Sequence, residues 1–149
     1  MLETWSEIYS NSAVWRTVVL FAHIGGLLLG GGAAVSADRL TLVSETGDAR
    51  QLRTLAAVHR VVLSGLAAMI VSGLLMLGAD FETFIRSPWF WTKMALIVLL
   101  LGNGVRVLRA EQAARAGEPS GWPRLRQAAV VSLVLWFLIT LVGTVLPNV

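Results

Sequence analysis

The sequence contains no cysteine, which excludes disulfides, iron–sulfur clusters, thiolate metal ligands and covalent haem attachment through a CxxCH motif. Charged residues are also scarce, at 14% of 149 residues. Within the apolar stretches no two carboxylates are paired, and no serine or threonine is visibly placed beside a base. These absences leave little support for the chemistry of soluble enzymes.

The positive charge of the chain is small and dispersed. Its isoelectric point of about 10.6 rests on a net charge of only +3. The arginines lie between apolar stretches and do not form a basic stripe along one segment. We therefore expect no nucleic-acid partner, and we use the arginines as indicators of membrane topology.

Long apolar runs dominate what the sequence does contain. Hydrophobic residues make up 56% of the chain and the mean hydropathy is +0.71, far from the values of a soluble domain. A helix needs about 20 apolar residues to cross a hydrocarbon core of ~30 Å. The sequence thus predicts an all-α fold in which residues 1–149 form one integral membrane four-helix bundle of up-down-up-down topology. The four expected spans are residues 14–35, 55–77, 89–108 and 128–146.

The distribution of arginine and lysine near these spans predicts their orientation. Basic residues concentrate in cytoplasmic loops, and two of the three inter-span connections are rich in arginine. We therefore expect both termini on the non-cytoplasmic side of a bacterial inner membrane. The arginines of the two rich connections are Arg39, Arg50 and Arg53, and Arg109, Arg115, Arg124 and Arg126, against Arg16, Arg86 and Lys93 on the other side.

The segments between the spans carry recognisable local signals. Residues 1–12 are acidic and polar where a signal peptide would be basic, so we expect the first span to be retained and this segment to lie at the membrane interface. Asn11 or Ser12 would cap the first helix. Glycine and proline place the connections at 46–48, 79–88 and 115–123.

His23 lies alone in the apolar run from Phe21 to Arg39 and is the strongest functional candidate. A residue that can ligate a metal or carry a proton is costly inside a span. Gly26 and Gly30 follow three and seven positions later and share its helix face, where they predict a groove for a flat cofactor or another helix. Because small residues recur every four positions over residues 22–34, close helix packing is the favoured interpretation of the glycines.

The two histidines of the chain are expected at different depths in the membrane. In an antiparallel hairpin that turns at Gly47, His23 lies opposite Ile70, and eleven residues of helix separate it from the level of His59. That is ~16 Å, whereas the imidazoles of a bis-histidine haem each lie about 2 Å from one iron. A single haem between His23 and His59 is therefore not expected. The same arithmetic places His23 near Lys93 and Gly143.

The polar residues of the spans each allow more than one interpretation. His23 is either a packing residue that donates to a carbonyl or to Thr140 or Thr144, or the axial ligand of a b-type haem, with a proton relay or another metal as further options. His59, among arginines near the cytoplasmic surface and level with Arg106 and Val107, is more typical of an interfacial residue, although its neutral imidazole would also suit ligation. Lys93 suits an interface anchor or a partner for an anionic group such as a haem propionate.

Two further polar residues lie close to the spans. Asp38 and Arg39, where the first apolar run ends, are expected to form a solvated pair that fixes helix orientation. Asn103, in the third span, is expected to need a partner on another helix.

Two segments resemble known families of small bacterial four-helix membrane proteins. The segment AHIGGLLLGGGAAVSADRLTL resembles the His-x-x-Gly…Gly…Asp-Arg-Leu pattern of several CopD-like families. The segment SPWFWTKMALIVLLLGNGVRV resembles the Pro-x-Phe-x-x-Lys…Asn segment of CopD-like copper-resistance proteins and, more distantly, of HemJ-type protoporphyrinogen oxidases. The resemblance implies that His23 and Lys93 match the histidine and lysine implicated in haem or porphyrin handling in the HemJ type.

Three classes of function follow from these observations. The first is a haem b protein of electron transfer or redox chemistry, with His23 as ligand, Gly26 and Gly30 making room for the macrocycle, Lys93 on a propionate, and a quinone as a suitable partner. His59 is a further cofactor-binding candidate. The second is a cofactor-free accessory subunit that packs against a larger respiratory or photosynthetic membrane complex through its Gly/Ala-rich first helix. The third is a transporter, which would need a recognisable inverted repeat that the sequence lacks.

Overall fold

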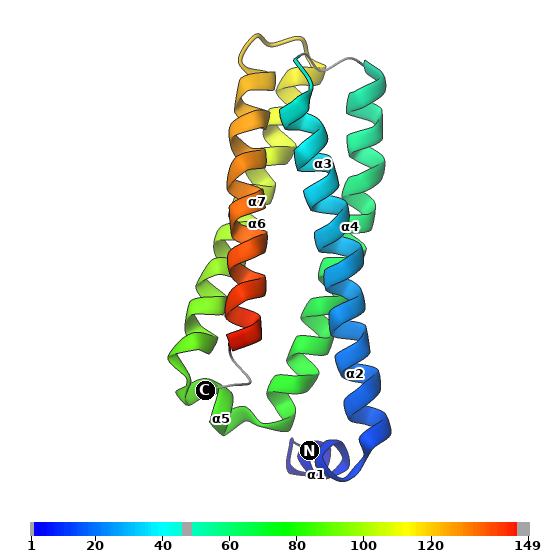
Figure 1. Ribbon diagram of the computed structural model, residues 1–149, viewed down its shortest axis with the longest axis vertical. Coiled ribbons are helices and arrows are strands. Elements are labelled where there is room, and N and C mark those ends of the chain that lie inside the picture. The colour runs from blue at the N-terminus through cyan, green and yellow to red at the C-terminus, as the bar shows by residue number, and fades with distance from the viewer. Residues whose placement is uncertain (1, 46–48, 146–149) are drawn as a thin grey trace.

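The structure is a computed structural model that describes residues 2–45 and 49–145, and Figure 1 shows a bundle of long helices. Four segments are long and apolar enough to cross a membrane, and the described residues contain no strand. The predicted all-α four-helix membrane bundle is therefore confirmed. In chain order the elements are α1 (Leu2–Asn11), α2 (Ala13–Gly26), the π-helical turn η1 (Leu27–Gly31), α3 (Gly32–Val43), α4 (Ala49–Ala79), α5 (Phe81–Arg86), α6 (Pro88–Arg115) and α7 (Gly121–Val145).

The first span is one continuous helix, Ala13–Val43, made of α2, η1 and α3. It begins as predicted at Ser12, whose hydroxyl accepts a hydrogen bond from the Trp15 N–H at 3.4 Å. The π-helical turn adds one residue to the helical repeat and so rotates the face that α3 presents relative to α2. The sequence pattern gave no indication of this turn. The connection predicted at 46–48 lies outside the described residues.

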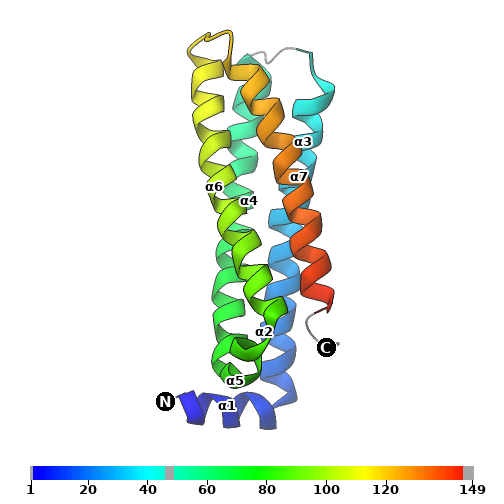
Figure 2. The same cartoon turned by 90° about the vertical axis from the view of Figure 1, so that its left-hand side faces the viewer.

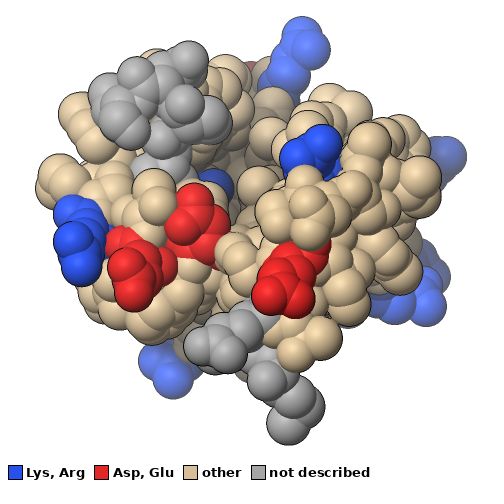
Figure 3. Space-filling view, turned by 90° about the horizontal axis from the view of Figure 1, so that it is seen from below, with Lys and Arg blue, Asp and Glu red and all other residues tan. Residues whose placement is uncertain are grey.

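The ends of the bundle differ. At the end that holds α1 and the last turn of α7, here called the terminal end, α1 lies across the bundle (Figure 2). It is fixed there because Trp5 Nε1 donates to the Leu75 carbonyl at 2.8 Å and Ser6 Oγ to the Ala79 carbonyl at 2.6 Å. Carboxylate side chains are scattered over this end (Figure 3). The connection expected at 79–88 is not a simple loop, because it contains the short helix α5.

The opposite end, here called the loop end, carries the connections from α3 to α4 and from α6 to α7 (Figures 1 and 2). The arginine-rich segments of the sequence all lie toward this end. The α6–α7 connection falls within the range predicted for it, and Gly117 adopts a positive φ of 78° there. Glycine suits this backbone conformation because it has no Cβ to clash.

The first span and α4 make a close helix contact at a glycine crossing. A Cβ added to Gly65 would lie 2.5 Å from the Gly30 Cα, and one added to Gly26 would lie 2.7 Å from the Gly65 carbonyl oxygen. Such close backbone approach supplies the van der Waals contact that holds helices together in lipid. The packing interpretation of the glycines is confirmed. The expectation that Gly26 and Gly30 make room for a macrocycle is wrong, because the backbone of α4 fills that face.

The first span changes its neighbour along its length. Its α2 part packs against α4, whereas its α3 part packs against α7, which also pairs with α6 along most of its length. The switch occurs at the π-helical turn, where Gly30 meets α4 and a Cβ on Gly31 would meet the Trp136 ring of α7 at 3.2 Å. Figure 1 shows the consequence, since α2 and the lower part of α4 diverge from α6 and α7 toward the terminal end.

Most apolar side chains of the spans point outward. In the most apolar window of each span, only 11% to 39% of the residues are buried inside the bundle. Large residues such as Phe21 and Leu28 are 76% and 70% exposed. Burial of this surface needs an apolar surrounding, which a lipid bilayer supplies.

The glycine crossing gives a direct test of the fold. We expect Gly65→Ala to lower the free energy of unfolding by about 2 kcal/mol or more, because the added methyl overlaps the backbone of the first span. The measurement is thermal or denaturant unfolding in detergent micelles. Gly25→Ala is the matched control, since nothing lies within 4 Å of a Cβ at that position. Equal stability of the two variants would contradict the crossing.

Candidate functional site

His23 is held by a hydrogen bond to α4. Its Nδ1 lies 3.0 Å from the Ser72 hydroxyl oxygen. The single hydroxyl proton of Ser72 is directed at the Ala68 carbonyl, 2.6 Å away, so the hydroxyl oxygen accepts a hydrogen bond from the Nδ1–H. This assignment gives the neutral imidazole its other nitrogen, Nε2, as a free lone pair. Metal-binding histidines are often held in this way by an acceptor on the second nitrogen, and histidines that pack between membrane helices make the same kind of bond.

The hydroxyl partner of His23 is Ser72, which was not among the predicted partners, whereas the predicted backbone contact is present at Met69. Thr140 donates to the carbonyl of Trp136 on its own helix, and Thr144 donates to that of Leu141. The physical reason is that α2 packs on α4 and has few close contacts with α7. Ser72 is two positions from Ile70, the residue predicted to lie opposite His23, so the predicted hairpin register is confirmed to within one turn.

Lys93 lies on α6 and contacts α7, whereas His23 lies on α2 and contacts α4. Its Nζ lies against the backbone of α7, since a Cβ on Gly143 would be 3.4 Å from it. The lysine side chain is half-buried. The predicted neighbourhood of Lys93 and Gly143 is thus confirmed. His23 and Lys93 stand on different helix pairs, at the end of the bundle where those pairs diverge.

His59 belongs to a separate ionic cluster at the loop end. Its Nδ1 lies 3.0 Å from Glu111 Oε2, so α4 and α6 are joined by this contact. The other oxygen of Glu111 is bound by Arg115, whose guanidinium also donates to the Leu52 carbonyl at 2.8 Å. The Glu111 side chain is only 6% exposed. This cluster neutralises a buried carboxylate and ties two helices together.

The His59 cluster lies far from His23 along the membrane normal. Thirteen residues of α4 separate His59 from Ser72, the partner of His23, which corresponds to ~20 Å of helix. The structure therefore confirms that one iron cannot take both histidines. His59 is not gathered with the other cofactor-binding candidates, because its imidazole is directed to Glu111. Sequence analysis missed Glu111, although its spacing of four from Arg115 is a helical ion-pair signal.

Asp38 is buried against α7. It is 8% exposed and hydrogen bonds to Ser132, whereas Arg39 is exposed. The expected solvated pair with Arg39 is therefore wrong. Asp38 lies seven positions after Gly31 and so shares the helix face that packs on α7. That spacing is the signal by which its burial could have been predicted.

Two buried oxygen atoms near α7 have no partner among the described residues. One is Oδ2 of Asp38, and the other is Oδ1 of Asn103. The Asn103 amide donates to the Ala128 carbonyl at 2.9 Å, which is the predicted contact with another helix. Ala128 and Ser132 are one turn apart, so Asp38 and Asn103 reach nearly the same level of α7. Buried oxygens of this kind are satisfied by a proton, a water molecule or a cation.

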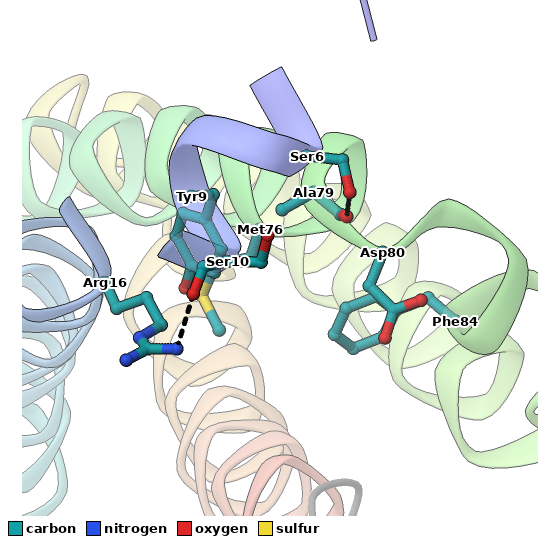
Figure 4. Close-up of a pocket in the computed structure, with 8 residues that line it drawn as sticks. All are labelled: Ser6, Tyr9, Ser10, Arg16, Met76, Ala79, Asp80 and Phe84. Atoms are coloured by element: carbon teal, nitrogen blue, oxygen red, sulfur yellow. Dashed lines mark hydrogen bonds between the residues drawn. The ribbon is translucent and has the colours of Figure 1, made fainter. Parts of the chain in front are cut away.

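A cavity of about 450 Å³ lies beneath α1 at the terminal end (Figure 4). Arg16 lies at its edge and donates through Nη1 to the Ser10 carbonyl at 2.9 Å. The cavity lining does not include His23, Lys93 or any other residue predicted to bind a cofactor. Its lining residues are Ser6, Tyr9, Ser10, Arg16, Met76, Ala79, Asp80 and Phe84.

The ionic cluster at the loop end predicts a large effect of losing its cation. Arg115→Ala should lower the free energy of unfolding by about 3 kcal/mol, because it leaves the buried Glu111 carboxylate without its main partner. Addition of Glu111→Gln should restore part of the loss by removing the charge. Denaturant unfolding in micelles measures both effects. Arg60→Ala, at an exposed position, is the control, and an equal loss there would contradict the role of the cluster.

Comparisons with protein-family models, with curated proteins and with solved structures found no match. The interpretation of the site therefore rests on the chemistry and geometry of its own residues.

Proposed function

We propose that this chain is a membrane redox protein that holds a b-type haem through His23 and serves electron transfer or a related oxidation. The observation that carries the proposal is the hydrogen bond from His23 Nδ1 to Ser72, which directs the imidazole to bind through Nε2. The resemblance of the segments around His23 and Lys93 to CopD-like and HemJ-type proteins supports the same assignment.

The donor set favours a cofactor over a bare metal ion. The described part of the chain contains no group of three or more His, Asp or Glu side chains that would hold a metal by themselves. A porphyrin supplies four nitrogen ligands, so one histidine is sufficient to anchor its iron. When bound, the haem would supply one-electron chemistry.

The remaining residues restrict where such a group would lie. The glycine crossing leaves no space between α2 and α4, so the cofactor would occupy the side of His23 toward Lys93. The Lys93 ammonium, seated on Gly143, would pair with an anionic propionate. Gly26 and Gly30 would then serve the site indirectly by bringing Ser72 to His23.

The glycine crossing also bears on the accessory-subunit alternative. That alternative assigned the Gly/Ala-rich face of the first helix to a larger respiratory or photosynthetic complex. Gly26, Gly30 and Ala34 are instead buried within the chain, and Gly26 and Gly30 lie against Gly65. A partner complex would need another surface, so the haem proposal is the better supported of the two.

We further propose that the loop end faces the cytoplasm of a bacterial cell. The arginines of the first and last connections lie toward that end, and basic residues are retained on the cytoplasmic side during insertion. Both termini, and the His23 site in the half of the bundle near them, would then lie toward the non-cytoplasmic side. A quinone in the bilayer would be a suitable redox partner at that depth.

An optical spectrum tests the haem proposal. The full chain, expressed with a haem supply and purified, should show a Soret band and a pyridine haemochrome typical of haem b. His23→Ala should abolish both signals, whereas the matched variant His59→Ala should keep them. A wild-type protein without a Soret band, or a His23→Ala variant that retains its haem, would contradict the proposal.

Ser72 is expected to act as a positioning residue. Ser72→Ala should weaken haem binding by roughly 10-fold to 100-fold, because the imidazole loses the acceptor that fixes its tautomer and orientation. The haem that remains should show a shifted reduction potential in a redox titration. Ser64→Ala, at an exposed position two turns earlier on α4, is the control. Unchanged affinity and potential in Ser72→Ala would show that the hydrogen bond serves packing alone.

A further inference from the structure

A second pocket, of about 380 Å³, opens between α6 and α7 at the loop end, and side chains with hydrogen-bond donors line it. Arg106 and Arg109 come from one face of α6, three positions apart, and Arg124 and Gln127 have the same spacing on α7. The remaining lining residue is Ala110. The pocket thus combines three guanidinium groups with one side-chain amide.

Among the residues that the structure describes, no carboxylate forms an ion pair with these arginines. Within residues 2–45 and 49–145, the ion pairs join other residues, and none involves Arg106, Arg109 or Arg124. The carboxylate next to the pocket in sequence, Glu111, is buried and already bound by Arg115. Three like charges around one pocket repel each other, and an anion between them would relieve this repulsion. Guanidinium groups match the oxygens of a phosphate particularly well, since each can donate two parallel hydrogen bonds.

The surface beside the pocket is apolar. Toward the middle of the bundle, Val105 lies one turn before Arg109 on α6 and is 47% exposed. On α7, Val131 and Val134 lie one and two turns beyond Gln127 and are 36% and 53% exposed. A phosphate group in the pocket would therefore have outward-facing apolar side chains on its membrane side. Acyl chains would cover such a surface, whereas a free phosphate ion would leave it unused.

We propose that this pocket binds the headgroup phosphate of an anionic phospholipid. The three arginines and Gln127 donate to the phosphate oxygens, and the acyl chains run along the exposed valines of α6 and α7. Basic pockets between spans at a membrane surface bind lipids of this class. The site lies at the opposite end of the bundle from the Lys93 region and requires no haem. The lipid proposal can therefore be tested independently of the function proposed for His23.

Native mass spectrometry of the full chain tests the proposal. The protein is extracted from nanodiscs that contain equal amounts of phosphatidylglycerol and phosphatidylcholine, and the lipids that remain bound are identified. We expect the wild type to retain phosphatidylglycerol over phosphatidylcholine by about tenfold or more, since each arginine near an anionic headgroup contributes roughly fivefold to affinity. The variant R106Q/R109Q/R124Q should lose this preference.

A charge-matched control separates a built pocket from general attraction. The variant R39Q/R50Q/R60Q removes the same charge from exposed positions of the first span and α4 near the loop end, and it should keep the preference. If the single variants R106Q and R124Q are needed because the triple variant does not fold, each should reduce the preference several-fold. The proposal is overturned if the pocket variants retain phosphatidylglycerol as the wild type does, or if the control loses it equally. Displacement of the lipid by millimolar inorganic phosphate would show a free-anion site and would also overturn it.

Discussion

The contact of Gly26 and Gly30 with Gly65 is the constraint on which the rest of the structure depends. Lipid gives two apolar helices no hydrophobic reason to associate, so close backbone packing must supply the attraction. This crossing holds α2 on α4 and brings His23 beside Ser72. The same contact prevents a flat cofactor from lying on the glycines. It therefore both creates the polar environment of the histidine and limits where a ligand can approach it.

The π-helical turn extends this constraint to the other half of the bundle. At this turn Gly30 faces α4 while the next residue, Gly31, accepts the Trp136 ring of α7. The face that continues from Gly31 carries Asp38 into the bundle. Turns of this kind occur frequently at functional sites, and here one begins at Leu27, one turn of helix after His23. A single irregularity thus divides the first span into a part that belongs to α4 and a part that belongs to α7.

Polar side chains are distributed in separate layers. Near the terminal end, His23 bonds to Ser72, and at the loop end His59 contacts Glu111 while Arg115 neutralises it. Each layer satisfies its buried groups with partners on a neighbouring helix, because lipid offers none. Among the described residues, the exceptions are the two unpartnered oxygens near α7 and the Trp122 indole nitrogen. The separation of the layers by ~20 Å of helix gives the haem proposal at one end and the lipid proposal at the other different residues and different tests.

The sequence by itself determined the four spans, the order of the helices and the hairpin register of the first two, because each follows from run length, turn residues and a fixed rise per residue. It also determined that Lys93 and Gly143 lie at one level, and the small residues of the first span marked its packed face. Only the tertiary structure decided which neighbour each helix face meets. In lipid an apolar pattern surrounds the whole helix, so hydrophobicity carries no periodic signal for the buried side. The burial of Asp38 and the partners Ser72 and Glu111 depend on helix rotation, so they could not be read from depth alone.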